Sequence, residues 1–251
     1  MPHGERTGRR SATDDVSQDR PGNQILKMLP ECDYRSLAKH LEGVTLPRRK
    51  IVARPYESPE HAYFPTSSVF SSVILLESGG TVEAWTTGNE GMTGTGLLVG
   101  SGAGMYQVLQ QVPGHSLRVR ADAFRRVVGQ SEALSRVLQR YALVLADRGA
   151  QNAACNQHHT IEERTARWLL ETSERLGTNS IELTQDLLAE MLGVRRQSVN
   201  LTLRVLSRAG LIRSGRGTVA ILDRPGVEQV SCECYRVVRE SYDRLMRAPA
   251  R

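Results

Sequence analysis

The sequence predicts an α+β protein built from a β-rich N-terminal half, one long helix and a C-terminal winged helix-turn-helix. Three observations lead to this fold class. Frequent turn signals divide residues 44–120 into short strand-like stretches, as in closed or sandwiched all-β domains. The expected strands are 44–46, 51–53, 61–64, 69–76, 81–87, 106–111 and 116–120. Residues 131–156 contain no proline and no glycine before Gly149. Residues 183–222 hold two short amphipathic helices joined at a glycine, followed by two short strands.

The helix-turn-helix is the clearest element. Thr184 is a good N-cap for a first helix, and Gly193 can adopt the positive φ that ends it. The apolar residues of the second helix fall on one side, and Gly210 is placed to end that helix. Residues 211–213 and 218–222 then read as the two strands of a wing around a Ser-Gly-Arg-Gly turn.

Charge in this segment points to DNA. Between residues 191 and 222 there are six arginines and no aspartate or glutamate. An exposed helix usually mixes both signs, whereas a phosphate backbone selects positive charge alone. A solvated helix face is the alternative interpretation. We therefore expect double-stranded DNA as partner, contacted by Thr184, Arg195, Arg196, Gln197, Ser198, Asn200, Leu201, Thr202, Arg204, Arg208 and Arg216.

The long helix carries a heptad pattern. One stripe alternates in steps of four and three, and a second stripe (Val137, Val144 and Gln151) lies beside it. Two stripes suggest that the helix packs on the β domain and also on its twin in a homodimer. Packing within its own chain alone is the alternative. The expected dimer interface is Leu134, Leu138, Tyr141, Leu145, Arg148, Asn152 and Cys155.

These elements define the expected domains. Residues 1–22 have almost no apolar side chain, which predicts a disordered tail. Next come a β domain with flanking helices (23–130), the dimerisation helix (131–157), the DNA-binding domain (158–226), and a C-terminal segment (227–251). A Thr-Ile-Glu-Glu capping box (160–163) opens the first helix of the DNA-binding domain. We expect that segment to be a single helix from Val227 to about Met246, docked on the DNA-binding domain.

Several classes of protein and site are not expected. The four cysteines form no Cys-x-x-Cys pair, and Cys232 and Cys234 would point to different sides of a helix, so we expect free thiols and no metal site. No apolar run approaches the roughly 18 residues of a membrane span, and no signal peptide is evident, which favours a cytoplasmic protein. No nucleophile groups with a base, so we expect no catalytic residues and no enzyme.

The order of these elements resembles the family of the cyclic-AMP receptor protein and Fnr, the Crp/Fnr transcription regulators. The resemblance is carried by Tyr-Phe-Pro-Thr-Ser (63–67), Gly-Asn-Glu-Gly-Met (88–92), residues 163–170 and most strongly residues 183–212. It implies a jelly-roll β domain like those that bind cyclic nucleotides and a homodimer built on the long helix. It also implies a palindromic operator and RNA polymerase as a further partner.

The β domain departs from the pattern of the family's cyclic-nucleotide binders. They hold the phosphate with an arginine and a serine shortly after a Gly-Glu pair. Glu90 matches that glutamate, but residues 91–117 contain no arginine or lysine, and Met105-Tyr106-Gln107 stands about where Arg-Ser-Ala would. Burying a phosphodiester without a cation is costly, although glycine N–H groups are an alternative. We expect no cofactor and no cyclic nucleotide. A sensor of a cyclic nucleotide or another small molecule, with regulated DNA binding, is the alternative function.

Other sensors of the family use an iron–sulfur cluster or a haem, which need cysteine or histidine ligands from the chain. An iron–sulfur cluster near the N-terminus is excluded, since Cys32 is the only cysteine among the first 150 residues. A haem on His61, His115, His158 or His159 and a redox switch at Cys155 remain alternatives.

The recognition helix departs from the family as well. Asn200-Leu201 stands where the family has a second arginine. Gln197 and Asn200 suit adenine and Leu201 a thymine methyl, so we expect an operator different from the usual TGTGA or TTGAT half-sites.

Overall fold

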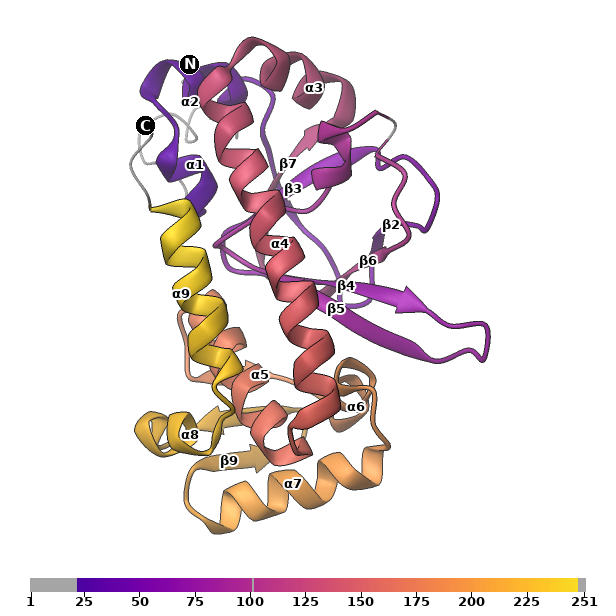
Figure 1. Ribbon diagram of the computed structural model, residues 1–251, viewed down its shortest axis with the longest axis vertical. Helices are drawn as coiled ribbons and strands as arrows, with labels where there is room; N and C mark the ends of the chain where they lie inside the picture. The colour runs from indigo at the N-terminus through magenta and orange to yellow at the C-terminus, as the bar shows by residue number, and fades with distance from the viewer. Residues whose placement is uncertain (1–21, 101, 248–251) are drawn as a thin grey trace, which may run out of the picture.

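The computed structural model describes residues 22–100 and 102–247 (Figure 1). The expected disordered tail therefore lies outside the described residues, except for Gly22. The α+β fold class is confirmed: a two-sheet β-roll and a smaller helical domain are joined by the long helix α4 (Glu132–His158). No helix within the described ranges is long and apolar enough to cross a membrane.

Two antiparallel sheets form the β-roll. One has the strand order β1-β7-β3 and the other the order β2-β6-β4-β5. Every strand expected in this half is present, with ends that differ by at most two residues. The strands are β1 (Glu42–Thr45), β2 (Ile51–Ala53), β3 (His61–Pro65), β4 (Val69–Leu75), β5 (Thr81–Thr87), β6 (Gln107–Val112) and β7 (His115–Arg120).

Short helices cover one end of the roll and complete its core. They are α1 (Gln24–Met28), α2 (Glu31–Ala38), the 3-10 helix η1 (Thr95–Leu98) and α3 (Ala121–Gln130). Phe64 of β3 and Phe124 of α3 pack edge to face with ring centroids 6.3 Å apart. Leu134, Leu138 and Tyr141 of α4 are fully buried in the same cluster. The N-terminal half of α4 therefore belongs to the core of the β-roll.

The C-terminal domain begins where α4 ends. Thr160 and Glu163 form the expected capping box at the start of α5 (Ile161–Leu176). The helix-turn-helix follows as α6 (Gln185–Leu192) and α7 (Arg196–Arg208). The wing has three strands in the order β8-β10-β9: β8 (Ser180–Glu182), β9 (Ile212–Gly215) and β10 (Thr218–Ile221). Strand β8, with three residues, was not expected from the sequence.

The expectation of one C-terminal helix is wrong. The segment forms two helices, α8 (Arg224–Val230) and α9 (Cys234–Met246), because the chain leaves the helical conformation at Ser231. The expectation that Cys232 and Cys234 point to different sides of a helix is therefore also wrong. Cys232 precedes α9 and Cys234 is its first residue, and both are buried beside Cys155.

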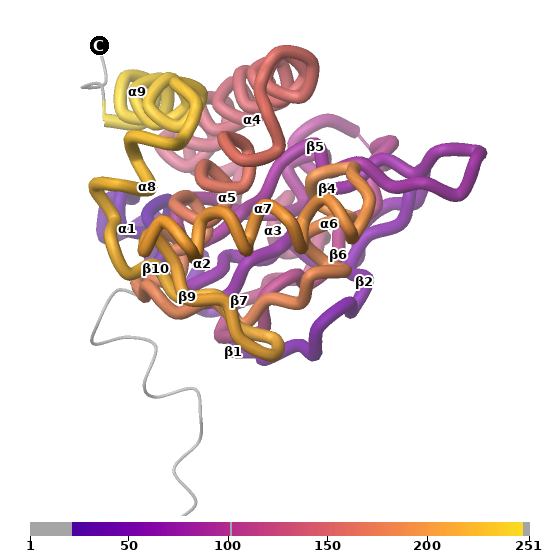
Figure 2. The backbone as a smooth tube through the Cα atoms, turned by 90° about the horizontal axis from the view of Figure 1, so that it is seen from below, coloured from indigo at the N-terminus to yellow at the C-terminus, as the bar shows by residue number. Residues whose placement is uncertain are grey.

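Helix α9 lies alongside α4 and docks mainly on it (Figures 1 and 2). The expected docking on the DNA-binding domain is also present, because Tyr235 of α9 is buried in the core cluster of that domain. Ser241 Oγ donates to Asp147 of α4 at 2.5 Å. Tyr242 is buried in the β-roll cluster, and its hydroxyl donates to the carbonyl oxygen of Glu90 at 2.8 Å. Apolar and polar contacts thus tie the C-terminus to α4 and to the loop after β5.

Candidate nucleic-acid interface

The helix-turn-helix is held by the features that the sequence predicted. Thr184 caps α6, accepting a hydrogen bond from the Leu187 N–H at 3.2 Å. Gly193 has φ 64° and ends α6, a conformation that glycine adopts without steric cost. Val199 and Leu203 of α7 are buried against α6 in the core of the domain. This packing fixes which face of α7 remains outside.

The outer face of α7 is polar and basic. Figure 2, seen from below, shows α7 crossing the front of the molecule with the β9–β10 turn beside it. The side chains exposed along this helix and at its start are Arg195, Arg196, Gln197, Asn200, Leu201, Arg204, Val205 and Arg208. Neither α7 nor the β9–β10 hairpin carries an acidic residue. The β9–β10 hairpin, which lies beside α7, carries the exposed Arg213 and Arg216.

Two residues of α6 contact and orient side chains near the start of α7. The sequence alone did not predict these contacts. Asn200 Nδ2 donates to Gln185 Oε1 at 3.1 Å. Arg196 Nε lies 3.3 Å from Asp186 Oδ1, an exposed ion pair. Both α6 residues lie just after the capping Thr184. The first helix of the motif therefore orients two side chains of α7 before any DNA is present.

One expected DNA contact is wrong. Thr202 is 1% exposed because it falls on the buried side of α7, and its hydroxyl donates to Glu162 Oε1 of α5 at 3.4 Å. Ser198 is partly buried, while Thr184 is exposed at the base of α6. Thr202 therefore stabilises the packing of α7 on α5 and does not reach the outer face.

The heptad stripe of α4 is turned inward, which contradicts its assignment to a dimer interface. Six of the seven residues are buried within their own chain: Leu134, Leu138, Tyr141, Leu145, Arg148 and Cys155. Asn152 is partly buried, and its side-chain amide donates to the Ala84 carbonyl of β5 at 2.6 Å. The pattern detected a buried face correctly, but the β-roll covers most of that face, and Cys232 and Cys234 cover Cys155.

The exposed side of α4 carries small residues around one leucine. Leu143 is 51% exposed, and Ala142, Ala146, Ala150 and Ala153 are exposed with it. Leu143, Ala146, Ala150 and Ala153 follow each other in steps of three and four, which places them on one helix face.

The DNA-binding domain packs directly on the β-roll. Val73 of β4 and Leu109 of β6 are buried in the same cluster as Leu188 and Met191 of α6. At the rim, Arg49 Nη2 lies 2.9 Å from Glu190 Oε2. The β-roll therefore contacts α6, the helix that supports the recognition helix.

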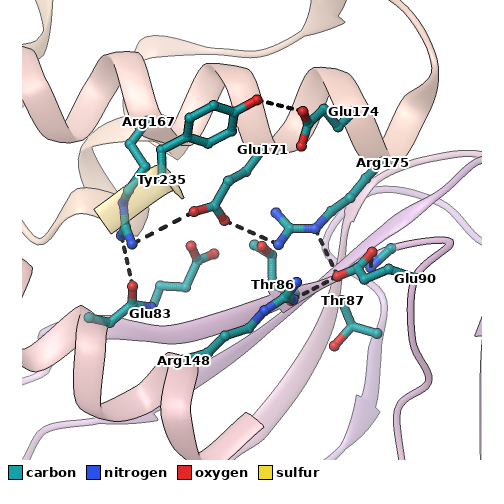
Figure 3. Close-up of polar contacts among 12 residues, drawn as sticks. Glu83, Thr86, Thr87, Glu90, Arg148, Arg167, Glu171, Glu174, Arg175 and Tyr235 are labelled. Carbon is teal, nitrogen blue, oxygen red and sulfur yellow. Dashed lines mark hydrogen bonds and ion pairs between the residues drawn. The ribbon is translucent and has the colours of Figure 1, made fainter. Parts of the chain in front are cut away.

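A buried network of arginines and glutamates joins the loop after β5 to α4 and α5 (Figure 3). Glu90 Oε1 accepts from Arg148 Nη1 of α4 at 2.7 Å and from Arg175 Nε of α5 at 2.9 Å. Arg175 Nη2 also lies 3.1 Å from Glu171 Oε2. Gly88 lies against the Arg175 side chain, where any larger residue would collide with it. The network thus connects all three parts of the chain.

Two glutamates of this region have opposite pKa shifts. Burial raises the pKa of Glu90, but the charges of Arg175 and Arg148 outweigh it and hold the value at about 2. Burial raises the pKa of Glu83 to about 7, against hydrogen bonds from Ser71 and Gln111. Glu90, which the resemblance aligned with a nucleotide-binding glutamate, is thus paired within the chain, while Glu83 titrates near neutrality.

The β-roll contains a cavity of about 320 Å³ that opens beside α4. Trp85 and Tyr106, packed edge to face at 4.5 Å, form one wall, and Ala142 and Ala146 of α4 form another. Arg54, from the segment after β2, also lines it. The sequence-based expectation considered only residues 91–117 as the source of a cation. It therefore missed Arg54, which lies outside that segment but lines the cavity.

Comparison with known families identifies the helical domain. Residues 163–230 match the family model of the Crp-like helix-turn-helix domain. No sequence among the curated proteins matches this chain closely enough to show a relationship.

Solved structures resemble the chain over most of its length. FixK2 from Bradyrhizobium japonicum has a TM-score of 0.66 at 16% identity, covering 76% of this chain and 98% of its own. The CRP-family transcriptional regulator TTHB099 from Thermus thermophilus has a TM-score of 0.63 at 18% identity, covering 75% and 96%. The c-di-GMP-responsive regulator CLP from Xanthomonas campestris has a TM-score of 0.58 at 17% identity, covering 76% and 99%. At these identities the likeness establishes the fold.

Proposed function

We propose that this chain, which belongs to the Crp/Fnr family by its helix-turn-helix domain and its fold, is a transcription regulator that binds a palindromic operator as a homodimer and needs no cyclic nucleotide. The observation that carries the proposal is the outer face of α7, which is exposed, basic and free of acidic residues beside an arginine-bearing wing. In a homodimer, two such helices enter successive major grooves about 34 Å apart.

Residues on this surface fall into two roles. Arg196, Gln197 and Asn200 lie near the start of α7, the part of a recognition helix that meets base edges. Gln197 and Asn200 have the donor and acceptor pair that adenine presents in the major groove, and Leu201 offers an apolar contact to a thymine methyl. The exposed Thr184, Arg195, Arg204, Arg208 and Arg216, with the partly buried Ser198, bind phosphates and set the register.

The dimer contact belongs to the outer side of α4. The inner side is occupied by the β-roll and a second side by α9, so the face around Leu143, Ala146 and Ala150 is the one open to a second copy of this chain. Alanines at steps of three and four let two helices approach closely, and a central leucine supplies apolar burial. We divide the chain accordingly into a sensor-like β-roll (23–130), a dimerisation helix (131–157) and a DNA-binding domain (158–226).

A regulated small-molecule sensor is the second candidate function. The cavity in the β-roll favours it, because Ala142 and Ala146 of α4 line the cavity and also belong to the exposed side of the helix. A molecule bound there would touch the proposed dimer face. Titration of the full-length protein with cyclic AMP and cyclic GMP separates the candidates: saturable micromolar binding would support the sensor, and its absence supports the proposal.

The test is selection of bound duplexes from a random library, followed by fluorescence anisotropy in graded salt. We expect a palindromic site whose half-sites differ from TGTGA and TTGAT. Arg196→Ala or Gln197→Ala should cost roughly 1–3 kcal/mol and relax one base position, and Arg216→Ala should weaken all sequences alike. The control is Arg35→Ala on α2, at the opposite end of the molecule from α7. A protein that stays monomeric, or shows no salt-dependent binding to any duplex, contradicts the proposal.

A further inference from the structure

Three cysteines and one histidine meet where α4, α8 and α9 come together. Cys155 and His159 lie at the end of α4, Cys232 lies in the break after α8, and Cys234 begins α9. The Sγ atoms and one ring nitrogen all lie within 4.8 Å of one another. The three cysteines are at most 3% exposed and form their own buried cluster.

The spacing fits one tetrahedral metal ion. Cys155 Sγ lies 3.6 Å from Cys232 Sγ, and Cys234 Sγ lies 3.6 Å from His159 Nδ1. Around Zn²⁺, with bonds of about 2.3 Å to sulfur and about 2.0 Å to nitrogen, tetrahedral ligand atoms stand roughly 3.5–3.8 Å apart. An iron–sulfur cluster places several atoms between its thiolates and holds them farther apart. Calcium and magnesium prefer oxygen ligands, which this set does not contain.

The groups around the four side chains orient them as ligands. His159 turns Nδ1 toward Cys234, while its other nitrogen, Nε2, lies 3.0 Å from the Glu233 carboxylate. A carboxylate on the far nitrogen is the usual partner of a metal-binding histidine, because it fixes the tautomer that leaves the near nitrogen free to coordinate. Gln151 Nε2 donates to Cys234 Sγ at 2.9 Å, the contact that a thiolate accepts from an amide.

Positive charge next to the cysteines complements this ligand set. Three thiolates and one neutral imidazole around a divalent cation carry a net charge of −1. The guanidinium of Arg167 is close enough to all three thiols to interact with them electrostatically. It is oriented by Asn152, whose Oδ1 accepts from Arg167 Nη2 at 2.7 Å.

We propose that Cys155, His159, Cys232 and Cys234 bind one Zn²⁺ ion. Two ligands precede the matched residues 163–230 and two follow them, so the ion would join the two ends of residues 160–231, a segment that contains the whole matched domain. When a metal site joins distant segments and is absent from the unfolded chain, the free energy of metal binding stabilises the folded state. The zinc therefore fastens the base of the DNA-binding domain to α4, the proposed dimerisation helix.

Metal content and cobalt spectroscopy of the full-length protein test the site. Protein purified under reducing conditions without chelator should contain about one zinc ion per chain when its metal content is measured by elemental mass spectrometry. Replacing zinc by Co²⁺ should give the intense visible bands of tetrahedral thiolate cobalt, with sulfur-to-metal charge transfer in the near ultraviolet. Because this test uses the wild-type protein, it does not depend on any variant folding.

The chain offers matched controls for each type of ligand. Cys155→Ser and Cys232→Ser should lose the metal, whereas Cys32→Ser, at the exposed fourth cysteine, should keep it. His159→Ala should weaken binding strongly while His158→Ala, at its exposed neighbour, should not. Glu233→Gln should lower affinity by roughly 10–100-fold through the loss of its contact with His159.

Three results would overturn the site. The first is reduced protein that takes up neither zinc nor cobalt at one equivalent. The second is cobalt that binds without charge-transfer bands, because thiolates are then not its ligands. The third is loss of the metal in Cys32→Ser as complete as in Cys155→Ser. If the first result is accompanied by a disulfide between Cys155 and Cys232 in the protein before reduction, the cluster is assigned to redox chemistry instead. None of these outcomes depends on DNA binding, so the site and the proposed function are tested separately.

Discussion

Replacing Glu83 by glutamine should make the protein more stable at alkaline pH and leave it unchanged at acid pH. Glu83 accepts hydrogen bonds from Ser71 at 2.6 Å and from Gln111 at 3.0 Å, both on Oε2, and an amide oxygen can accept both. Arg175 favours the ionised carboxyl and Glu171 opposes it, but burial is the largest influence and raises the pKa to about 7. The substitution therefore removes a charge whose burial is unfavourable while keeping the shape and hydrogen bonds of the side chain.

The sign follows from comparing the folded and unfolded carboxyl. The unfolded group releases its proton near pH 4.5 and the folded group near pH 7, so the free energy of unfolding falls as pH rises through this window. The shift corresponds to roughly 3 kcal/mol at 1.36 kcal/mol per pKa unit. Since Glu83 is partly exposed, solvent screening lowers the expected effect to about 2 kcal/mol.

The assay is urea denaturation of the wild-type protein and Glu83→Gln at pH 4, 5, 6, 7 and 8. The variant should match the wild type at pH 4, below the pKa of the unfolded carboxyl, and gain stability progressively from pH 5, with most of the gain by pH 8. Glu77→Gln, at an exposed position beyond β4, is the control and should show no such divergence. A constant difference between Glu83→Gln and the wild type across the series would refute the reasoning, because the carboxyl would then have the same pKa folded and unfolded.

Two further substitutions address the interior network and the dimer face. Arg175→Ala leaves Glu90 and Glu171 buried with one cation fewer, so the free energy of unfolding in urea should fall by roughly 3–5 kcal/mol, against little change for Arg236→Ala on the exposed side of α9. Leu143→Arg places a charge at the centre of the proposed dimer face and should shift the protein to monomer in sedimentation velocity, whereas Leu222→Arg, at an equally exposed leucine, should leave the dimer intact.

Local patterns predicted most of the architecture because they reflect physics within a few residues. Thr184 as a cap, Gly193 at positive φ and the Thr160–Glu163 capping box each depend on contacts one helical turn long. Alternating apolar residues and turn signals likewise placed the β-roll strands to within two residues. Strand β8 was missed since its three residues have one buried side chain, Ile181, and gain their pairing from β10 across the domain.

The side chains that meet across long separations left no signal in the sequence. Glu90 pairs with Arg175 from 85 positions away, and Cys155 meets Cys232 from 77 positions away. Arg54 reaches the β-roll cavity from outside the segment in which a phosphate-binding cation was sought. Turn and helix preferences do not specify such pairs, because the sheet topology and the packing of α9 on α4 create them.

The long helix shows most clearly why a periodic pattern does not identify its partner. Apolar residues at steps of three and four indicate only that one face of a helix is covered. In α4 that face packs on the β-roll, where Leu138 and Tyr141 are buried. Helix α9 covers a second face, where Ser241 bonds to Asp147. The face that remains for another subunit is poor in large apolar residues, so a search for hydrophobic heptads passes over it. Close approach of two helices requires small residues, and Ala146 and Ala150 meet that requirement where a stripe of leucines would hold the helices apart.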